Sequence, residues 1–110
     1  MNLHECIDVI DGLLSTPENK RVQEMLLKGE LNQNSRHLKL GSWVRNNCKL
    51  WTDGIEEINK DIKEINSTFR ADYDLNDTPD DVSSVILDIY VDLKAGRLGG
   101  LKVKMQEIGK

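Results

Sequence analysis

The chain has 110 residues, of which 38% are hydrophobic, 31% charged and 5% aromatic, and its formal net charge is −4. This length fits a single domain with a modest core, and no apolar run reaches the roughly 18–20 residues that a membrane-spanning helix needs. The first residues also lack the basic start and apolar stretch of a secretory signal, so we expect a cytoplasmic protein with no membrane contact.

The charges are segregated along the chain. Residues 28–51 contain five basic residues and one acidic residue, residues 52–93 contain three basic and twelve acidic residues, and residues 94–110 again contain five basic residues and one acidic residue. Blocks of opposite sign either pair with each other inside the fold or attract a partner of opposite charge.

Two helices are expected near the N-terminus. Apolar residues recur at helical spacing through residues 2–14, which predicts the first. The second is expected to begin around Ser15, because Glu18 completes a capping box and Pro17 suits a first helical turn. Gly29 is a typical C-terminal cap, so this helix should run to about residue 28.

A third helix is expected to begin at a capping residue between positions 32 and 35 and to run to residue 51. Its apolar stripe, at steps of four, four and three, consists of Leu40, Val44, Cys48 and Trp51. Gly41 interrupts this helix at a cost of about 1 kcal/mol relative to alanine. A glycine there indicates either a close approach of another backbone or a bend.

The strongest periodic pattern of the chain follows, with apolar residues at every third or fourth position. It consists of Ile55, Ile58, Ile62, Ile65 and Phe69. The pattern favours one helix that packs on its own core, and a short coiled-coil or homodimer seam is the alternative.

The last third of the chain is expected to hold an acidic loop, a long helix and a basic tail. Residues 71–78 form the acidic loop, and Thr78 and Pro79 open a helix that ends at Gly96. Residues 97–110 are read as a basic tail or short helix, although an isolated strand also fits their apolar spacing.

Together these elements predict an all-α fold, an irregular bundle of four to five helices in a single domain over residues 1–110. Its core is expected to consist of Leu40, Val44, Trp51, Ile58, Ile62, Ile65, Ile86, Ile89 and Leu93.

Cys6 and Cys48 do not form a Cys-x-x-Cys pair. We interpret them as two reduced core thiols of a cytosolic protein, with a disulfide or a metal site as the alternatives.

Asp72, Asp74 and Asn76 have the spacing that opens a calcium loop. Asp77 replaces the glycine that the sharp turn needs, and Ser83 replaces the closing glutamate, so we favour a solvated acidic loop. We expect no metal and no cofactor. His4 and His37 lack a ligand spacing, no glycine-rich loop opens a helix, and we therefore expect no catalytic residues and no enzyme activity.

The stretch from Leu40 to Trp51, which reads Leu-Gly-Ser-Trp-Val-Arg-Asn-Asn-Cys-Lys-Leu-Trp, resembles a motif in a family of small uncharacterised bacterial proteins. A later segment of that family, Asp-Asp-x-Ser followed by apolar residues, is similar to residues 80–86. The resemblance implies a domain of unknown function in which the two segments touch.

Arg45 and Asn46 are strong donors on an otherwise apolar helix, and Asp80 and Asp81 are acceptors at a helix start. We favour an internal Arg–carboxylate pair between these helices. The alternative is that Arg45 binds a ligand or partner carboxylate.

The function expected from these patterns is a small non-catalytic protein-binding module, such as an inhibitor or immunity protein of bacterial or phage origin. Its acidic face, defined here as Asp72, Asp74, Asp77, Asp80 and Asp81, would dock on a basic surface of a larger protein. The alternatives are a nucleic-acid-binding regulator that uses the basic helix at residues 35–49, and a homo-oligomer built on the isoleucine seam.

Overall fold

The computed structural model describes residues 1–32, 34–50 and 54–109, and these form six α-helices, one π-helical segment and no strand. The helices are α1 (Leu3–Leu14), α2 (Lys20–Leu27), η1 (Ser35–Leu40, the π-helix), α3 (Gly41–Asn47), α4 (Gly54–Phe69), α5 (Pro79–Ala95) and α6 (Leu101–Ile108). The all-α prediction is confirmed, with six α-helices in place of four to five. Within the described ranges, no helix has the length and apolar character needed to cross a membrane.

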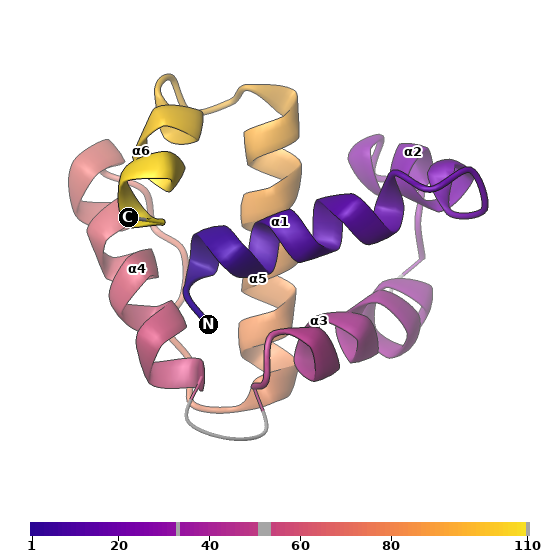
Figure 1. Cartoon of the computed structure of the whole chain (residues 1–110), viewed down its shortest axis with the longest axis horizontal. Helices are drawn as coiled ribbons and strands as arrows, with labels where there is room; N and C mark the ends of the chain where they lie inside the picture. Colours follow the sequence, from indigo (N-terminus) through magenta and orange to yellow (C-terminus); the bar gives the residue numbers. More distant parts are fainter. Residues whose placement is uncertain (33, 51–53, 110) are drawn as a thin grey trace.

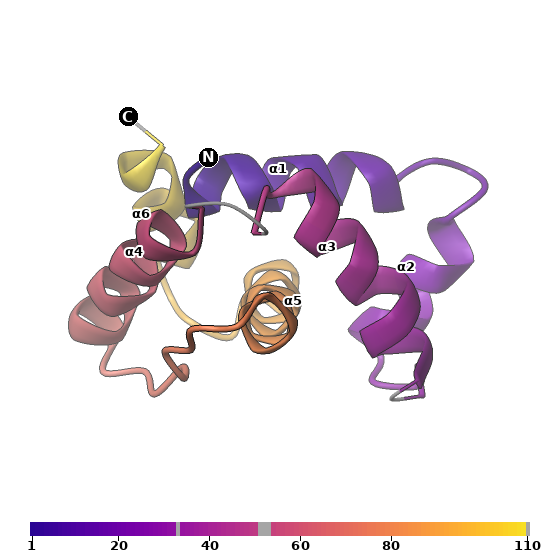
Figure 2. The same ribbon diagram turned by 90° about the horizontal axis from the view of Figure 1, so that it is seen from below.

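Helix α5 forms the centre of the fold. Figure 1 shows α1 crossing α5, with α4 and α6 to one side and α2 and α3 to the other. Figure 2, turned by 90°, shows α5 end-on beneath α1 and between these two groups. Because it has neighbours on several sides, α5 buries more than one face, and its buried residues are Val82, Ser83, Val85, Ile86, Leu87, Ile89, Tyr90 and Val91.

The expected core is largely confirmed. Seven of its nine predicted members have side chains that are at most 2% exposed, and these are Leu40, Val44, Ile58, Ile62, Ile65, Ile86 and Ile89. Leu93 is only partly buried and packs against the core, and Trp51 lies outside the described residues. Ile58, Ile62 and Ile65 are all 0% exposed, so the isoleucine seam packs on the chain's own core.

Helix α1 begins with a cap that the sequence analysis missed. The Asn2 side chain accepts the Glu5 backbone N–H at 2.8 Å, and the Glu5 side chain accepts the Asn2 N–H at 3.1 Å. From α4, the buried Asp61 carboxylate accepts the Leu3 N–H at 2.8 Å. The first N–H groups of a helix have no partner within the helix, so these contacts both start α1 and fix it to α4.

The capping box expected between Ser15 and Glu18 is wrong. Ser15 is the C-cap of α1, and α2 begins only at Lys20. The polar side chains of this turn satisfy the end of α1 instead, because Thr16 Oγ1 and Asn19 Nδ2 both donate to the Leu13 carbonyl, at 3.1 and 2.9 Å. Free carbonyls at a helix end compete for the same side chains that cap a helix start.

The single third helix expected up to residue 51 is also wrong. It is divided into η1 and α3, and the Gly41 N–H bonds to the Arg36 carbonyl in the π-helical pattern. Helix α3 ends at Asn47, followed by Cys48 as its cap and by Lys49 with a left-handed φ of 57°. A residue in this conformation cannot continue a right-handed helix.

The later elements match their predictions. The Thr78 side chain caps α5, Pro79 occupies its first turn, and Gly96 ends it with a left-handed φ of 68°. Of the two interpretations of residues 97–110, the short helix is confirmed by α6.

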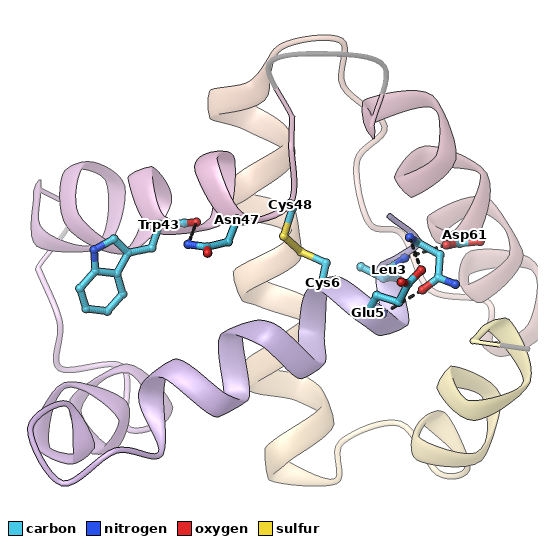
Figure 3. The surroundings of a disulfide bond; sticks show 8 residues. Leu3, Glu5, Cys6, Trp43, Asn47, Cys48 and Asp61 are labelled. Atoms are coloured by element: carbon cyan, nitrogen blue, oxygen red, sulfur yellow. Dashed lines mark hydrogen bonds between the residues drawn. A yellow bond between two sulfur atoms is a disulfide. The ribbon is translucent and has the colours of Figure 1, made fainter.

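The interpretation of the two cysteines as reduced thiols is wrong, because Cys6 and Cys48 form a disulfide with a Cα–Cα distance of 5.4 Å. Figure 3 shows the bond joining α1 to the end of α3. Sequence spacing could not reveal this pairing, since it depends on α3 ending at Asn47 and bringing its cap against α1.

Candidate functional site

The two segments of the family-like motif meet where the end of α3 packs on the start of α5. Arg45 is 8% exposed. Its Nη1 atom lies 3.4 Å from Asp80 Oδ1 and donates to Ser83 Oγ, also at 3.4 Å. Ser83 Oγ in turn donates to the Asp80 carbonyl at 2.7 Å. The expected internal contact is therefore present, and Ser83 is a member that the sequence analysis had not assigned to it.

Gly41 lies beside the contact of Arg45 with Asp80 and Ser83, which we call the Arg45 junction. A β-carbon at position 41 would lie 2.8 Å from Arg45 Nη1 and 3.5 Å from Ser83 Oγ. Because Arg45 follows one helical turn after Gly41, the guanidinium folds back over the glycine and fills the space that a side chain would take. The glycine thus admits a buried guanidinium, in place of the neighbouring backbone expected from the sequence.

The other two residues expected at this contact, Asn46 and Asp81, are exposed. Asn46 is exposed on α3, and Asp81 is exposed in the first turn of α5, where its carboxylate accepts the Thr78 hydroxyl at 3.0 Å. Two acids in this turn favour the helix start, because its N-terminal end carries a partial positive charge.

The five residues of the acidic face thus fall into two groups, those with a partner in the fold and those without an ion pair among the described residues. Asp80 and Asp81 take part in the Arg45 junction and in the Thr78 cap. The other three, Asp72, Asp74 and Asp77, are exposed and have no ion pair among the residues that the structure describes. We call these three the open acids.

The calcium interpretation finds no ligand cluster in the described part of the chain, where no three His, Cys, Asp or Glu side chains are placed to hold a metal ion. The loop is ordered by α4 instead. Asn66 bonds to both backbone groups of Tyr73, at 2.9 and 3.0 Å, and Asn59 Nδ2 donates to the Asn76 carbonyl at 2.8 Å.

Two of the open acids, Asp72 and Asp74, line a groove of about 500 Å³ between the acidic loop, the end of α2 and one side of α5. Leu26, Val85 and Val91 supply apolar surface within it. A groove that combines carboxylates with apolar walls can take a side chain with an aliphatic stem and a cationic end.

Ion pairs already occupy the α5 side of this groove. Asp88 pairs with Arg36, and Asp92 pairs with Arg97 at 2.9 Å. Tyr73 donates its hydroxyl to Asp92, and burial, this hydrogen bond and the nearby carboxylates raise the pKa of Tyr73 above its ordinary value. The acids still open to a partner therefore lie on the loop side.

The basic segment at residues 35–49 is partly committed to the fold. Arg36 pairs with Asp88, Arg45 is buried, and Asn47 donates to the Trp43 carbonyl at 2.8 Å. Figure 3 shows Asn47 folded back along α3 in this contact. Three polar side chains of this segment, those of Arg36, Arg45 and Asn47, therefore have partners within the chain.

Sequence reasoning missed the groove because its members are scattered over α2, the loop and α5. One signal was present, since Asp88 and Asp92 are four residues apart in the expected helix, which places them one above the other on its polar side. Arg36, the partner of Asp88, is 52 residues away in sequence and could not be assigned without the fold, whereas Arg97 is only five residues from its partner Asp92.

The comparisons with known proteins identify a family but no activity. A family model described as a domain of unknown function, DUF6794, matches residues 1–93, which include every member of the Arg45 junction and the open acids. No curated protein and no solved structure matches the chain. The chain belongs to the family of domains of unknown function DUF6794.

Proposed function

We propose that this chain is a non-catalytic protein-binding module whose open acids dock on a basic segment of a larger protein. The observation that carries the proposal is that Asp72, Asp74 and Asp77 remain exposed and without an ion pair among the described residues, while the other acids of the face have partners. Charges with no internal partner are the ones that can attract a partner molecule.

The groove gives this docking a physical form. An arginine or lysine of the partner would place its charge between Asp72 and Asp74 and its aliphatic stem along Val85 and Val91. Lys28, at another edge of the groove, limits how much positive charge can enter. One or two basic side chains are therefore a better fit than a long polybasic tract.

Titration of the labelled protein with a short peptide that contains two arginines, followed by amide resonances, tests this placement. We expect saturable shifts at residues 72–77 and at Asp88 and Asp92, which weaken as salt is raised because exposed charges are screened. Shifts spread over the whole surface, or centred on α4, would contradict the proposal.

Nucleic-acid binding through residues 35–49 is less well supported, because Arg36 and Arg45 already have partners in the fold. Phosphate contacts usually dominate such binding, and each committed cation removes one of them. A salt-dependent shift of labelled DNA by the intact chain, abolished by Lys39→Gln, would revive this function.

A homo-oligomer built on the isoleucine seam is also less well supported, since Ile58, Ile62 and Ile65 are buried in the chain's own core. A mass in solution that rises with concentration, and that falls back on Ile55→Gln, would favour it.

The expected cytoplasmic location went together with the interpretation of Cys6 and Cys48 as reduced thiols. Because Cys6 and Cys48 are joined, we propose instead a compartment in which disulfides persist. Thiol trapping in the cells that make the protein tests this point: blocked cysteines support an oxidising compartment, and two trapped thiols support the cytoplasm.

A further inference from the structure

A second hollow, of about 370 Å³, lies among α1, α5 and α6 and contains none of the residues assigned above to docking. Its volume is near the lower end of the range for small-molecule sites, which is about 300–1,000 Å³. Ile7, Leu93 and Met105 give it an apolar lining, one residue from each helix.

The acids that line this pocket already have partners. Asp11 accepts the Tyr90 hydroxyl at 2.9 Å and pairs with Lys94 at 3.1 Å, and Asp8 Oδ2 lies 3.2 Å from His4 Nε2, an ion pair when His4 is protonated. Burial alone would raise the pKa of Asp11, but the contacts with Tyr90 and Lys94 outweigh it and leave that pKa below its usual value. Asp11 therefore holds its negative charge in internal contacts, and the mostly exposed Asp8 does so when His4 is protonated.

The polar side chains on the α6 side of the pocket differ from those on α1, because they have no partner among the described residues. Lys102 and Gln106 line the pocket, and the side chain of neither has a hydrogen bond or ion pair with any described residue. An ammonium group offers only donors, and an amide offers donors beside one acceptor. The polar groups still open in this pocket are thus mainly donors, and they stand next to an apolar surface.

We propose that this pocket binds a small carboxylate with an apolar body, the carboxylate on Lys102 and Gln106 and the body against Ile7, Leu93 and Met105. The two lining residues that select the charge belong to α6, which begins at Leu101, beyond the family match that ends at residue 93. The proposal does not depend on docking through the open acids.

Amide resonances recorded during a titration with hexanoate, and separately with hexanol, test the proposal. Hexanoate is expected to cause saturable shifts at Ile7, Tyr90 and Met105. Hexanol shares the apolar chain but lacks the charge, and it should bind about fivefold more weakly, as expected for one partly exposed ion pair.

The variant Lys102→Met should weaken hexanoate about fivefold and leave hexanol unchanged. Lys63→Met is the matched control, because Lys63 is exposed on α4 and does not line the pocket. The proposal is overturned if millimolar hexanoate causes no saturable shift at the lining residues, if hexanol binds as well, or if both variants weaken hexanoate equally. Because Lys102 is exposed, we expect Lys102→Met to keep the fold. Amide resonances of residues far from the pocket that stay at their wild-type positions would verify this.

Discussion

Cys6 and Cys48 are 42 residues apart in sequence, and their disulfide joins the first turn of α1 to the residue that caps α3. Both side chains are 0% exposed. The bond therefore lies inside the core and fixes α1 directly to the segment that carries Arg45.

Removal of this disulfide should lower stability considerably. A cross-link over a loop of this length restricts the unfolded chain and is worth about 3–4 kcal/mol. We predict that the double variant Cys6→Ala, Cys48→Ala unfolds at a clearly lower urea midpoint than the oxidised protein. A reductant should lower the midpoint of the wild type and leave that of the variant unchanged. Equal midpoints for all samples would show that the bond contributes nothing.

Replacement of Arg45 should destabilise the fold more than replacement of its carboxylate partner. Arg45 is 8% exposed, whereas the Asp80 side chain is 55% exposed. We predict a loss of about 2 kcal/mol for Arg45→Ala, from lost packing and from orphaned polar groups. Asp80→Asn should cost under about 1 kcal/mol because water screens an exposed partner. Urea unfolding of both variants measures this order, and a larger loss for Asp80→Asn would contradict it.

Two glycines offer a matched pair. At Gly54 a β-carbon would lie 2.9 Å from the Lys49 carbonyl oxygen and 3.0 Å from that of Cys48, whereas at Gly12 nothing lies within 4 Å. Gly54→Ala should therefore destabilise by about 1–3 kcal/mol through overpacking against backbone. Gly12→Ala should stabilise by about 0.5–1 kcal/mol, because alanine favours the helix. Thermal unfolding of both variants tests the opposite signs.

Asp61 should give the protein a characteristic dependence on pH. Burial raises the pKa of Asp61, with Glu57 and Glu64 adding to the effect and the Leu3 N–H opposing it. The folded state therefore keeps the proton to a higher pH than the unfolded chain. The stability gained from this retained proton is fully present below the pKa of Asp61 in the unfolded chain, and it is lost as pH rises through the pKa of Asp61 in the folded state.

The variant Asp61→Asn keeps an acceptor for the Leu3 N–H but cannot ionise. Between about pH 3 and pH 6, we predict that the wild type loses stability relative to this variant. Asp77→Asn, at an exposed position, is the control and should show no such trend. A wild type that instead gains stability over Asp61→Asn as pH rises would reverse the sign of the argument.

The helices could be predicted where the signal was local. The periodicity of Ile58, Ile62 and Ile65 and the Thr78–Pro79 start of α5 each depend on a few neighbouring residues, and they were correct. One error arose where two neighbouring helix ends compete for the same side chains, since Ser15 and Thr16 lie at the end of α1 instead of at the start of α2. Another arose from a distant partner, since Cys48 meets Cys6 only because α3 stops early.

The candidate site followed the same rule. The contact between Arg45 and Asp80 could be expected from donors and acceptors in two short segments. The groove beside the open acids could not, because it requires α2, the acidic loop and Arg36, which is 52 residues from Asp88, to meet at α5.

The most direct test of the proposed docking compares three forms of the chain as bait in lysate of the cells that make it, at low and high salt. These are the wild type, the variant Asp72→Asn, Asp74→Asn, Asp77→Asn, and the control Glu18→Gln, Glu24→Gln, Glu56→Gln, which changes the net charge equally at exposed positions. We predict one protein that the wild type and the control retain at low salt, that high salt releases, and that the aspartate variant fails to retain. Equal retention by the aspartate variant and the wild type would contradict docking through the open acids.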